Sequence, residues 1–102
     1  MNETLDICAL EKLPDGRPQA FFPLGLPVLL LRRGAEVFAL ENRCAHMGCP
    51  LSSGRLDGYT LQCPCHDWRF DVRDGRFLDA PEISLRTYAA TVKDGRVHLR
   101  LP

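Results

Sequence analysis

Cysteine and histidine are concentrated in two short segments of this chain, which hold four of its five cysteines and two of its three histidines. The first segment reads Cys44-Ala45-His46-Met47-Gly48-Cys49 and the second reads Cys63-Pro64-Cys65-His66. Thiolates are soft, strongly donating ligands, and neutral imidazoles add nitrogen ligands without adding negative charge. Two thiolates and two imidazoles supplied by two loops would hold zinc or the iron of an iron–sulfur cluster. Packing of single buried thiols does not account for the clustering.

The order and spacing of these residues favour one of the two metals. Cys44 and His46 form a Cys-x-His motif, sixteen residues follow, and Cys63 and His66 form a Cys-x-x-His motif. In this pattern the chain resembles the Rieske iron–sulfur family, most closely over residues 42–72. The resemblance implies one [2Fe-2S] cluster, with the two cysteines on one iron and the two histidines on the other. Structural zinc held by the same residues is the alternative.

The mixed ligand set has a consequence for the redox potential. Two imidazoles in place of two thiolates remove two negative charges, so reduction becomes easier than in an all-cysteine cluster. Such sites have potentials of about −150 to +300 mV, against about −400 mV for plant-type ferredoxins. Reduction adds negative charge, which raises the proton affinity of the histidine nitrogens that do not face iron. We therefore expect electron uptake to be coupled to protons at alkaline pH.

Two more cysteines belong to the motifs but are not needed as ligands. Cys49 and Cys65 match positions at which the Rieske proteins of quinol-oxidising complexes carry a disulfide, and the resemblance implies the same disulfide here. Beyond the second motif the chain departs from those proteins, because Trp68 and Phe70 cannot donate the hydroxyl hydrogen bonds that raise their potentials. This stretch is similar to the Rieske domains of ring-hydroxylating oxygenases and their soluble ferredoxins. We expect a potential at the low end of the family range.

Three further positions around the motifs carry expectations. Asp67 replaces a usual glycine of the family, and its carboxylate either disfavours an extra electron nearby or simply points into water. The segment 80–82, Ala-Pro-Glu, resembles the proline-containing loop that covers the cluster, a plain surface turn being the alternative. Leu51, Trp68 and Pro81 are the candidates for an apolar wall around the cluster.

The remaining chain must position the two loops, and it has the pattern of an all-β protein. Arg33-Gly34 and four Asp-Gly pairs, which begin at residues 15, 57, 74 and 94, are turn signals between segments of strand-like alternation. No segment has sustained helical periodicity. The predicted strands are Thr4–Ala9, Val28–Arg32, Val37–Glu41, Thr60–Gln62, Arg69–Val72, Arg76–Leu78, Thr87–Val92 and Arg96–Leu101.

These elements predict a single domain over residues 1–102. The resemblance implies a Rieske-like antiparallel β-sandwich or barrel into which a small cluster-binding subdomain is inserted. We assign the base to residues 1–42 and 70–102 and the cluster-binding subdomain to residues 43–69. A chain of 102 residues buries enough surface for one core but not for two.

Composition excludes several classes of protein. The chain has 13 Lys and Arg against 13 Asp and Glu, so a basic nucleic-acid binder is excluded. The most apolar stretch, residues 21–31, is shorter than the about 20 residues of a membrane-spanning helix and contains two prolines. No secretory signal is visible at the N-terminus. We expect a cytoplasmic protein that binds neither nucleic acid nor membrane.

The expected function is that of a one-electron carrier between a flavin-dependent reductase and a terminal oxygenase or similar acceptor. We do not expect an enzyme, because only His98 remains beyond the two motifs for a mononuclear iron site and no glycine-rich dinucleotide motif is present. His98 is interpreted as a polar strand residue and Cys8 as a packed core thiol. The alternative is a small subunit of a larger redox enzyme, similar to that of assimilatory nitrite reductase. We expect a monomer that meets its partners through small, transient interfaces.

Overall fold

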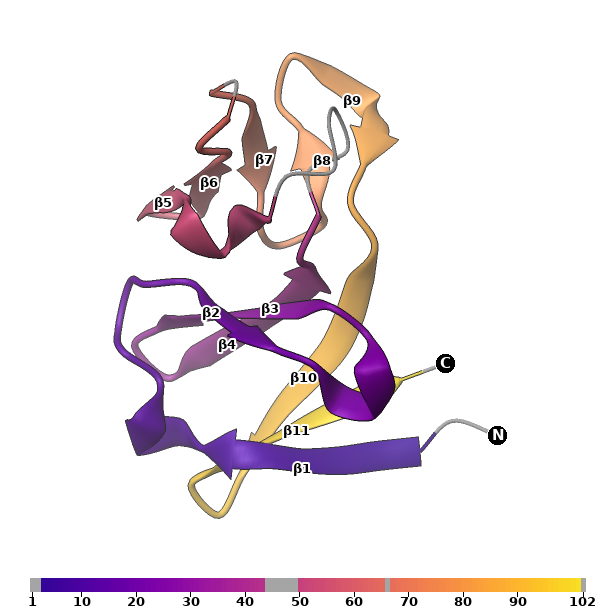
Figure 1. Ribbon diagram of the computed structural model, residues 1–102. Coiled ribbons are helices and arrows are strands. Elements are labelled where there is room, and N and C mark those ends of the chain that lie inside the picture. The colour runs from indigo at the N-terminus through magenta and orange to yellow at the C-terminus, as the bar shows by residue number, and fades with distance from the viewer. Residues whose placement is uncertain (1–2, 44–49, 66, 102) are drawn as a thin grey trace.

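Two antiparallel sheets make up the computed structural model, which describes residues 3–43, 50–65 and 67–101 (Figure 1). The first sheet has the order β1-β11-β10-β4-β3-β2. Its strands are β1 (Glu3–Ala9), β2 (Gln19–Phe21), β3 (Val28–Arg33), β4 (Glu36–Glu41), β10 (Thr87–Lys93) and β11 (Arg96–Leu101). The second sheet has the order β5-β6-β7-β8-β9, with β5 (Arg55–Asp57), β6 (Thr60–Gln62), β7 (Arg69–Asp71), β8 (Arg76–Phe77) and β9 (Ala80–Ser84). The predicted all-β class is confirmed.

The helical elements of the described residues are single 3-10 turns: η1 (Leu10–Lys12), η2 (Pro23–Gly25) and η3 (Leu51–Ser53). None of them is long or apolar enough to cross a membrane. The η3 turn matters for the site, because it follows the first cysteine- and histidine-containing segment directly.

All eight predicted strands are present, and their ends differ from the prediction by no more than one residue. Three further strands were not predicted. β2 and β5 have three residues each. β9 contains Pro81, which reads as a strand breaker; the structure tolerates it because β9 is an edge strand of its sheet.

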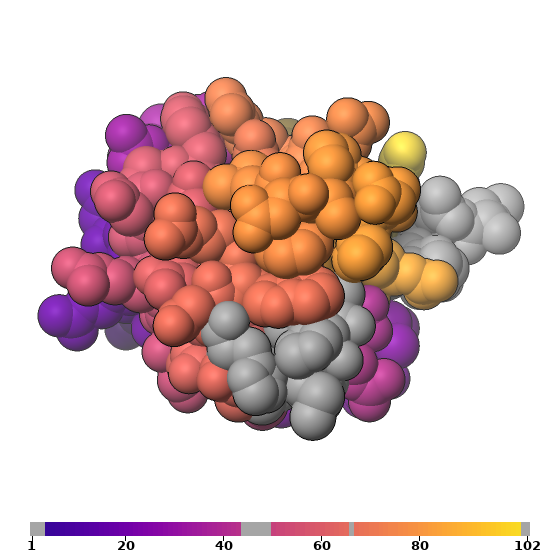
Figure 2. All heavy atoms as spheres, turned by 90° about the horizontal axis from the view of Figure 1, so that it is seen from above, coloured from indigo at the N-terminus to yellow at the C-terminus, as the bar shows by residue number. Residues whose placement is uncertain are grey.

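The second sheet extends further along the sequence than the predicted inserted subdomain. We assigned residues 70–102 to the base, whereas β7, β8 and β9 continue the second sheet from β6 up to Ser84. The chain returns to the first sheet only at β10. Figure 2 shows the molecule from above, on the side of the second sheet. The orange atoms that dominate this view belong to the later strands of that sheet.

The core lies on both faces of β3, whose first four residues are all buried. Leu29 and Leu31 join a cluster shared with the second sheet, which includes Leu61 and Phe70. On the opposite face, Val28 and Leu30 pack with Ala39, Val97, Leu99 and Leu13. A strand buried on both faces has a continuous apolar sequence rather than an alternating one, as Val28-Leu29-Leu30-Leu31 does. β3, together with Leu40 of the neighbouring β4, therefore packs against the second sheet.

Tyr59, in the turn between β5 and β6, connects the two sheets on their outer side. Its hydroxyl donates a hydrogen bond of 2.6 Å to Glu36 Oε1 of β4, and its ring meets Phe38 edge-on at 5.8 Å. The guanidinium carbons of Arg33 and Arg73 lie 4.9 and 4.5 Å from the ring centre. Cation–π contacts of this kind are attractive, so Tyr59 is a polar and aromatic link between the base and the second sheet.

Gly75 allows the β7–β8 turn to approach the crossover to the first sheet closely. Its φ is 79°, and a Cβ placed there would lie 2.5 Å from the Leu85 carbonyl oxygen. The Leu85 amide donates a 2.8 Å hydrogen bond to the Gly75 carbonyl. Any side chain at position 75 would therefore push the two segments apart.

Candidate metal centre

The two metal-ligand motifs predicted from the sequence follow strands of different sheets. The first follows β4 of the first sheet, and the second connects β6 to β7 of the second sheet. Of the predicted site, the structure describes the predicted ligand Cys63 and the predicted disulfide cysteine Cys65. The other predicted members, Cys44, His46, Cys49 and His66, lie outside the described residues, as does Met47.

Cys63 is wholly buried and carries a free thiol. It belongs to the cluster between the sheets, where its neighbours are leucine, valine and phenylalanine side chains. Its backbone amide donates a 2.7 Å hydrogen bond to the Trp68 carbonyl, and its carbonyl accepts a 3.1 Å bond from the Asp67 amide. These bonds close residues 63–68 into a compact loop and fix the position of the sulfur.

Asn42 fixes the start of the first motif segment and is the one buried polar side chain of the described residues, 8% exposed. Its Oδ1 accepts hydrogen bonds from the amides of Leu51, at 2.7 Å, and Ser52, at 3.0 Å. The backbone amide of Asn42 donates a 3.0 Å hydrogen bond to the Pro27 carbonyl. Residues 42 and 51 are thereby joined, so the segment between them starts and ends at one place. Sequence analysis missed Asn42, although asparagine directly after a strand is a frequent loop-capping residue.

Buried residues next to the two motifs meet in one cluster. Leu51, directly after the first motif segment and Pro50, is wholly buried in the same cluster that contains Cys63. The apolar cluster therefore contains both Leu51, which follows the first motif segment, and Cys63, which begins the second. A soft sulfur ligand held by the backbone among apolar side chains suits an iron–sulfur cluster, because the surroundings exclude water and lower the local dielectric.

Asp67 has φ 59°, in the left-handed region that favours glycine. Asparagine and aspartate are the other residues that adopt this region readily, which explains how Asp67 takes the place of the family's usual glycine. Its side chain is exposed.

Three aromatic rings pack together directly after the second motif. Trp68 stacks on Phe77 with ring centres 4.0 Å apart and an interplanar angle of 4°. Phe70 lies 6.4 Å from Trp68 and 5.6 Å from Phe77. Offset and stacked aromatic pairs add attraction beyond their buried area, so β7 and β8 hold the end of this loop.

Of the candidates for an apolar wall, Leu51 is buried and Trp68 is half-buried, but Pro81 is exposed. Residues 80–82 form neither a loop nor a surface turn, because they begin strand β9. Proline at an edge strand lacks only an N–H group that would have no strand partner.

The two residues that we assigned to the scaffold lie in the first sheet. Cys8 is half-buried on β1 and packs against the second core cluster, and burial raises the pKa of its thiol. His98 is half-buried on β11, opposite Asp6 and Thr91 of the neighbouring strands. Both positions agree with a structural role.

Comparison with known proteins gives one family and relatives that match the chain over nearly its whole length. The family model described as "Rieske [2Fe-2S] domain" matches residues 3–89. The 3-phenylpropionate/cinnamic acid dioxygenase ferredoxin subunit of Photorhabdus laumondii subsp. laumondii is 36% identical over an alignment 99 residues long, which covers 93% of this chain and 91% of the relative.

Two solved structures show the same fold. The putative NADH-dependent nitrite reductase small subunit from Mycobacterium tuberculosis has a TM-score of 0.91 and 26% identity, and the match covers 100% of this chain and 97% of that chain. A chain in the complex of reduced oxygenase and oxidized ferredoxin in carbazole 1,9a-dioxygenase has a TM-score of 0.86 and 30% identity, covering 95% and 92%.

Proposed function

Because the chain belongs to the Rieske [2Fe-2S] family and is an electron carrier rather than a catalytic enzyme, we propose that Cys44 and Cys63 hold one iron of its single cluster and that His46 and His66 hold the other. The bound cluster accepts and releases one electron. The main support for this ligand set from the described residues is Cys63, a buried free thiol whose loop is closed by two backbone hydrogen bonds.

We propose that the cluster-binding part of this single domain comprises residues 43–69, carried by the second sheet. Asn42 and the loop 63–68 support this division, because each closes one motif segment at its base. Leu51 and Cys63 share a buried cluster, which agrees with motif segments that converge above it.

The proposed partners are a flavin-dependent reductase as electron donor and a terminal oxygenase as acceptor. The oxygenase is supported by the relative named as a dioxygenase ferredoxin subunit and by the solved complex of an oxygenase with its ferredoxin. A second candidate is a small subunit of a nitrite reductase-like enzyme, which the fold match to such a subunit favours. We propose that the protein acts in the cytoplasm and as a monomer.

Spectroelectrochemical titration of the purified protein, with paramagnetic resonance of the reduced state, tests the cluster and its ligands. We expect visible absorption that bleaches on reduction and a low potential within the Rieske range. The variants Cys63→Ser and His66→Ala should lose the signal, whereas the control Cys8→Ser should keep it. A colourless protein that contains zinc would contradict the proposal.

We also propose a disulfide between Cys49 and Cys65 that ties the two motif segments together. It is supported by the free thiols of the described residues, which are Cys8 and Cys63, and by the exposed position of Cys65 next to the buried ligand. Mass spectrometry after alkylation without reduction should find both cysteines unmodified by the alkylating agent. Alkylation of both in the freshly isolated protein would contradict the pairing.

A further inference from the structure

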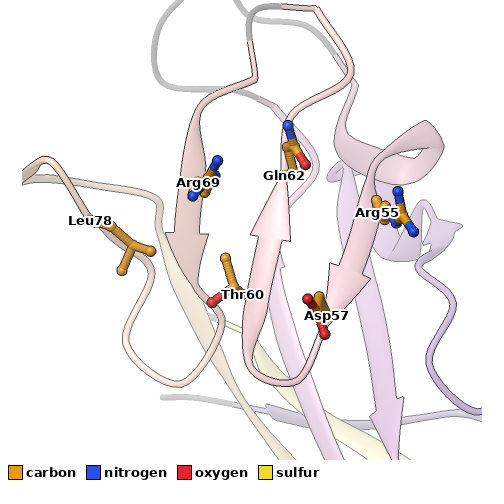
Figure 3. A pocket seen from close by; sticks show the side chains of 6 residues that line it. All are labelled: Arg55, Asp57, Thr60, Gln62, Arg69 and Leu78. Atoms are coloured by element: carbon orange, nitrogen blue, oxygen red, sulfur yellow. The ribbon is translucent and has the colours of Figure 1, made fainter.

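The outer face of the second sheet carries a row of polar side chains across three strands. Arg55 of β5 lies opposite Gln62 of β6, and Gln62 lies opposite Arg69 of β7. Neighbouring strands are about 4.8 Å apart, so the two arginine backbones are separated by about 10 Å. Leu61 and Phe70, on the other face of the same strands, are wholly buried in the core. One face of this sheet is thus used for folding, and the arginine row lies on the other (Figure 3).

The row borders a shallow depression of about 460 Å³. Its lining consists of Arg55, Asp57, Thr60, Gln62, Arg69 and Leu78. In Figure 3 the side chains of β5, β6 and β7 stand on one side of the sheet, with Leu78 beside them. Leu78 is 47% exposed and provides the apolar contact of this surface. Arginine together with an exposed apolar side chain is typical of protein interfaces.

The lining of this depression carries a net positive charge. Arg73, Arg76 and Arg96 each form an ion pair with an aspartate. Arg55 and Arg69 form none with any residue that the structure describes. Asp57 is the single acidic residue of the lining, against two arginines. Each guanidinium offers five N–H donors, and the Gln62 amide adds further donors between them.

The row also lies beside the proposed ligand loop. Gln62 directly precedes Cys63, and Arg69 directly follows Trp68. The Trp68 carbonyl accepts a hydrogen bond from the Cys63 backbone amide. A protein that covered the row would contact both strand ends from which the loop 63–68 arises. Electron transfer needs such proximity, and transient redox encounters use small interfaces.

From these observations we propose that Arg55, Gln62, Arg69 and Leu78 form a docking surface for a redox partner with a carboxylate-rich surface. The inference rests on the proposed function, because it assigns a partner's position relative to the cluster. Two carboxylates of the partner would accept hydrogen bonds from the two guanidiniums, and the apolar rim would cover Leu78. Arginine–carboxylate pairs at a partly desolvated interface give both affinity and a defined orientation.

Electron transfer to two small haem proteins of opposite charge tests the proposal. The reduced protein is mixed with cytochrome b5, which is acidic, or with cytochrome c, which is basic. The variant Arg55→Glu/Arg69→Glu is compared with the control Arg17→Glu/Arg100→Glu, which makes the same change in net charge at exposed positions elsewhere. At low ionic strength, we expect the first variant to reduce cytochrome b5 at least about tenfold more slowly than wild type, because steering of this kind changes association rates by about 10- to 1000-fold.

The control should slow that reaction less than the Arg55→Glu/Arg69→Glu variant does, and at about 0.1 M salt it should lie within about twofold of wild type, since the Debye length is then about 10 Å. With cytochrome c, the Arg55→Glu/Arg69→Glu variant should react faster than wild type. Equal slowing by both double variants, or no slowing by either, would overturn the proposal. If the double reversal fails to fold, the pair Arg55→Gln/Arg69→Gln, compared with Arg17→Gln/Arg100→Gln, tests the same expectation.

Hydrogen–deuterium exchange with cytochrome b5 separates the docking surface from the electron-carrier function. Protection of peptides that cover residues 55–62 and 69–78 supports the docking surface, even if no electron is transferred. Protection without electron transfer would contradict the proposed function and leave the docking surface standing. Electron transfer with protection confined to the first sheet would overturn the docking surface and leave the function standing.

Discussion

At the residue scale, the backbone around Asp67 imposes a requirement that is separate from its charge. Its φ of 59° is unfavourable for most L residues, by about 1–2 kcal/mol in the left-handed region. Its amide is also needed for the bond that closes the loop onto Cys63. The position therefore selects glycine, asparagine or aspartate for conformation, while aspartate alone adds a negative charge beside the proposed ligand His66.

Three substitutions at Asp67 separate these two effects. Asp67→Gly and Asp67→Asn keep the conformation and remove the charge, whereas Asp67→Ala removes the charge and adds backbone strain. We expect denaturant unfolding to show stability equal to or above wild type for glycine and a loss of about 1 kcal/mol for alanine. All three should raise the midpoint potential by a similar amount in spectroelectrochemical titration. A potential unchanged in all three would mean that the carboxylate only points into water.

Asn42 allows a second test at the level of one side chain. Asn42→Ala leaves the amides of Leu51 and Ser52 without their acceptor, and a buried unpaired amide costs about 1–3 kcal/mol. We expect lower stability in urea unfolding and faster loss of visible absorption in the presence of a chelator. Asn42→Asp keeps an acceptor at both amides and should retain more of the stability. Equal behaviour of the two variants would show that the hydrogen bonds do not hold the loop.

At the element scale, the two sheets are joined by apolar packing on β3 and by the contacts of Tyr59. The apolar contacts are central, since Leu29 and Leu31 are wholly buried. The Tyr59 contacts lie at the edge, where its hydroxyl meets Glu36. Because the second sheet carries the proposed ligand loop, these contacts determine how firmly the loop is held on the base.

Substitution of Tyr59 should weaken this junction in two steps. Tyr59→Phe removes the hydrogen bond to Glu36 and keeps the ring, so we expect a loss below about 1 kcal/mol at this exposed contact. Tyr59→Leu also removes the contacts with Arg33 and Arg73, which are worth about 0.5–1 kcal/mol each at exposed sites. Thermal or urea unfolding should rank wild type above phenylalanine and phenylalanine above leucine. If the Tyr59→Leu variant is as stable as Tyr59→Phe or more stable, the cation–π contacts do not contribute to stability.

The edge strand β1 predicts a dependence of stability on pH. A hydrogen bond from Arg96 lowers the pKa of Asp6 below its usual value. A carboxyl group with a lowered pKa in the folded state stabilises the protein above its unfolded pKa of about 3.9, and this contribution is lost as pH falls through the folded pKa. The difference in stability between wild type and Asp6→Asn should therefore be present at pH 6 and disappear at strongly acidic pH. In an Arg96→Gln background, which removes the hydrogen-bond donor, Asp6→Asn should show no such difference.

At the scale of the whole molecule, the sequence predicted what short-range rules specify. The clustering of cysteine and histidine indicated a metal site, and the resemblance of the two motifs to the Rieske pattern implied Cys44, His46, Cys63 and His66 as its ligands. Hairpins demand residues with positive φ, and Asp94-Gly95 at φ 53° and 74° joins β10 to β11 as expected. The apolar run of β3 likewise predicted a strand, although not that both of its faces would be buried.

Long-range contacts account for what was missed. Nothing local in the sequence indicates that the Asn42 side chain would bond to residues 51 and 52, or that Tyr59 would reach β4. Strand β9 was not predicted because Pro81 reads as a strand breaker, whereas its position at the edge of the sheet tolerates proline. The arginine row could not be predicted either, since it depends on the register of three separate strands.

Trp68, which stacks on Phe77, is the sole tryptophan of the chain. Its fixed position has a practical consequence. The residue lies in the loop that ends the second motif, two positions after His66. Its ultraviolet-excited emission comes from this one place, and an iron–sulfur chromophore nearby would quench it by energy transfer. An increase in the fluorescence intensity of Trp68 should therefore report the loss of iron in real time, without a spectroscopic label on the protein.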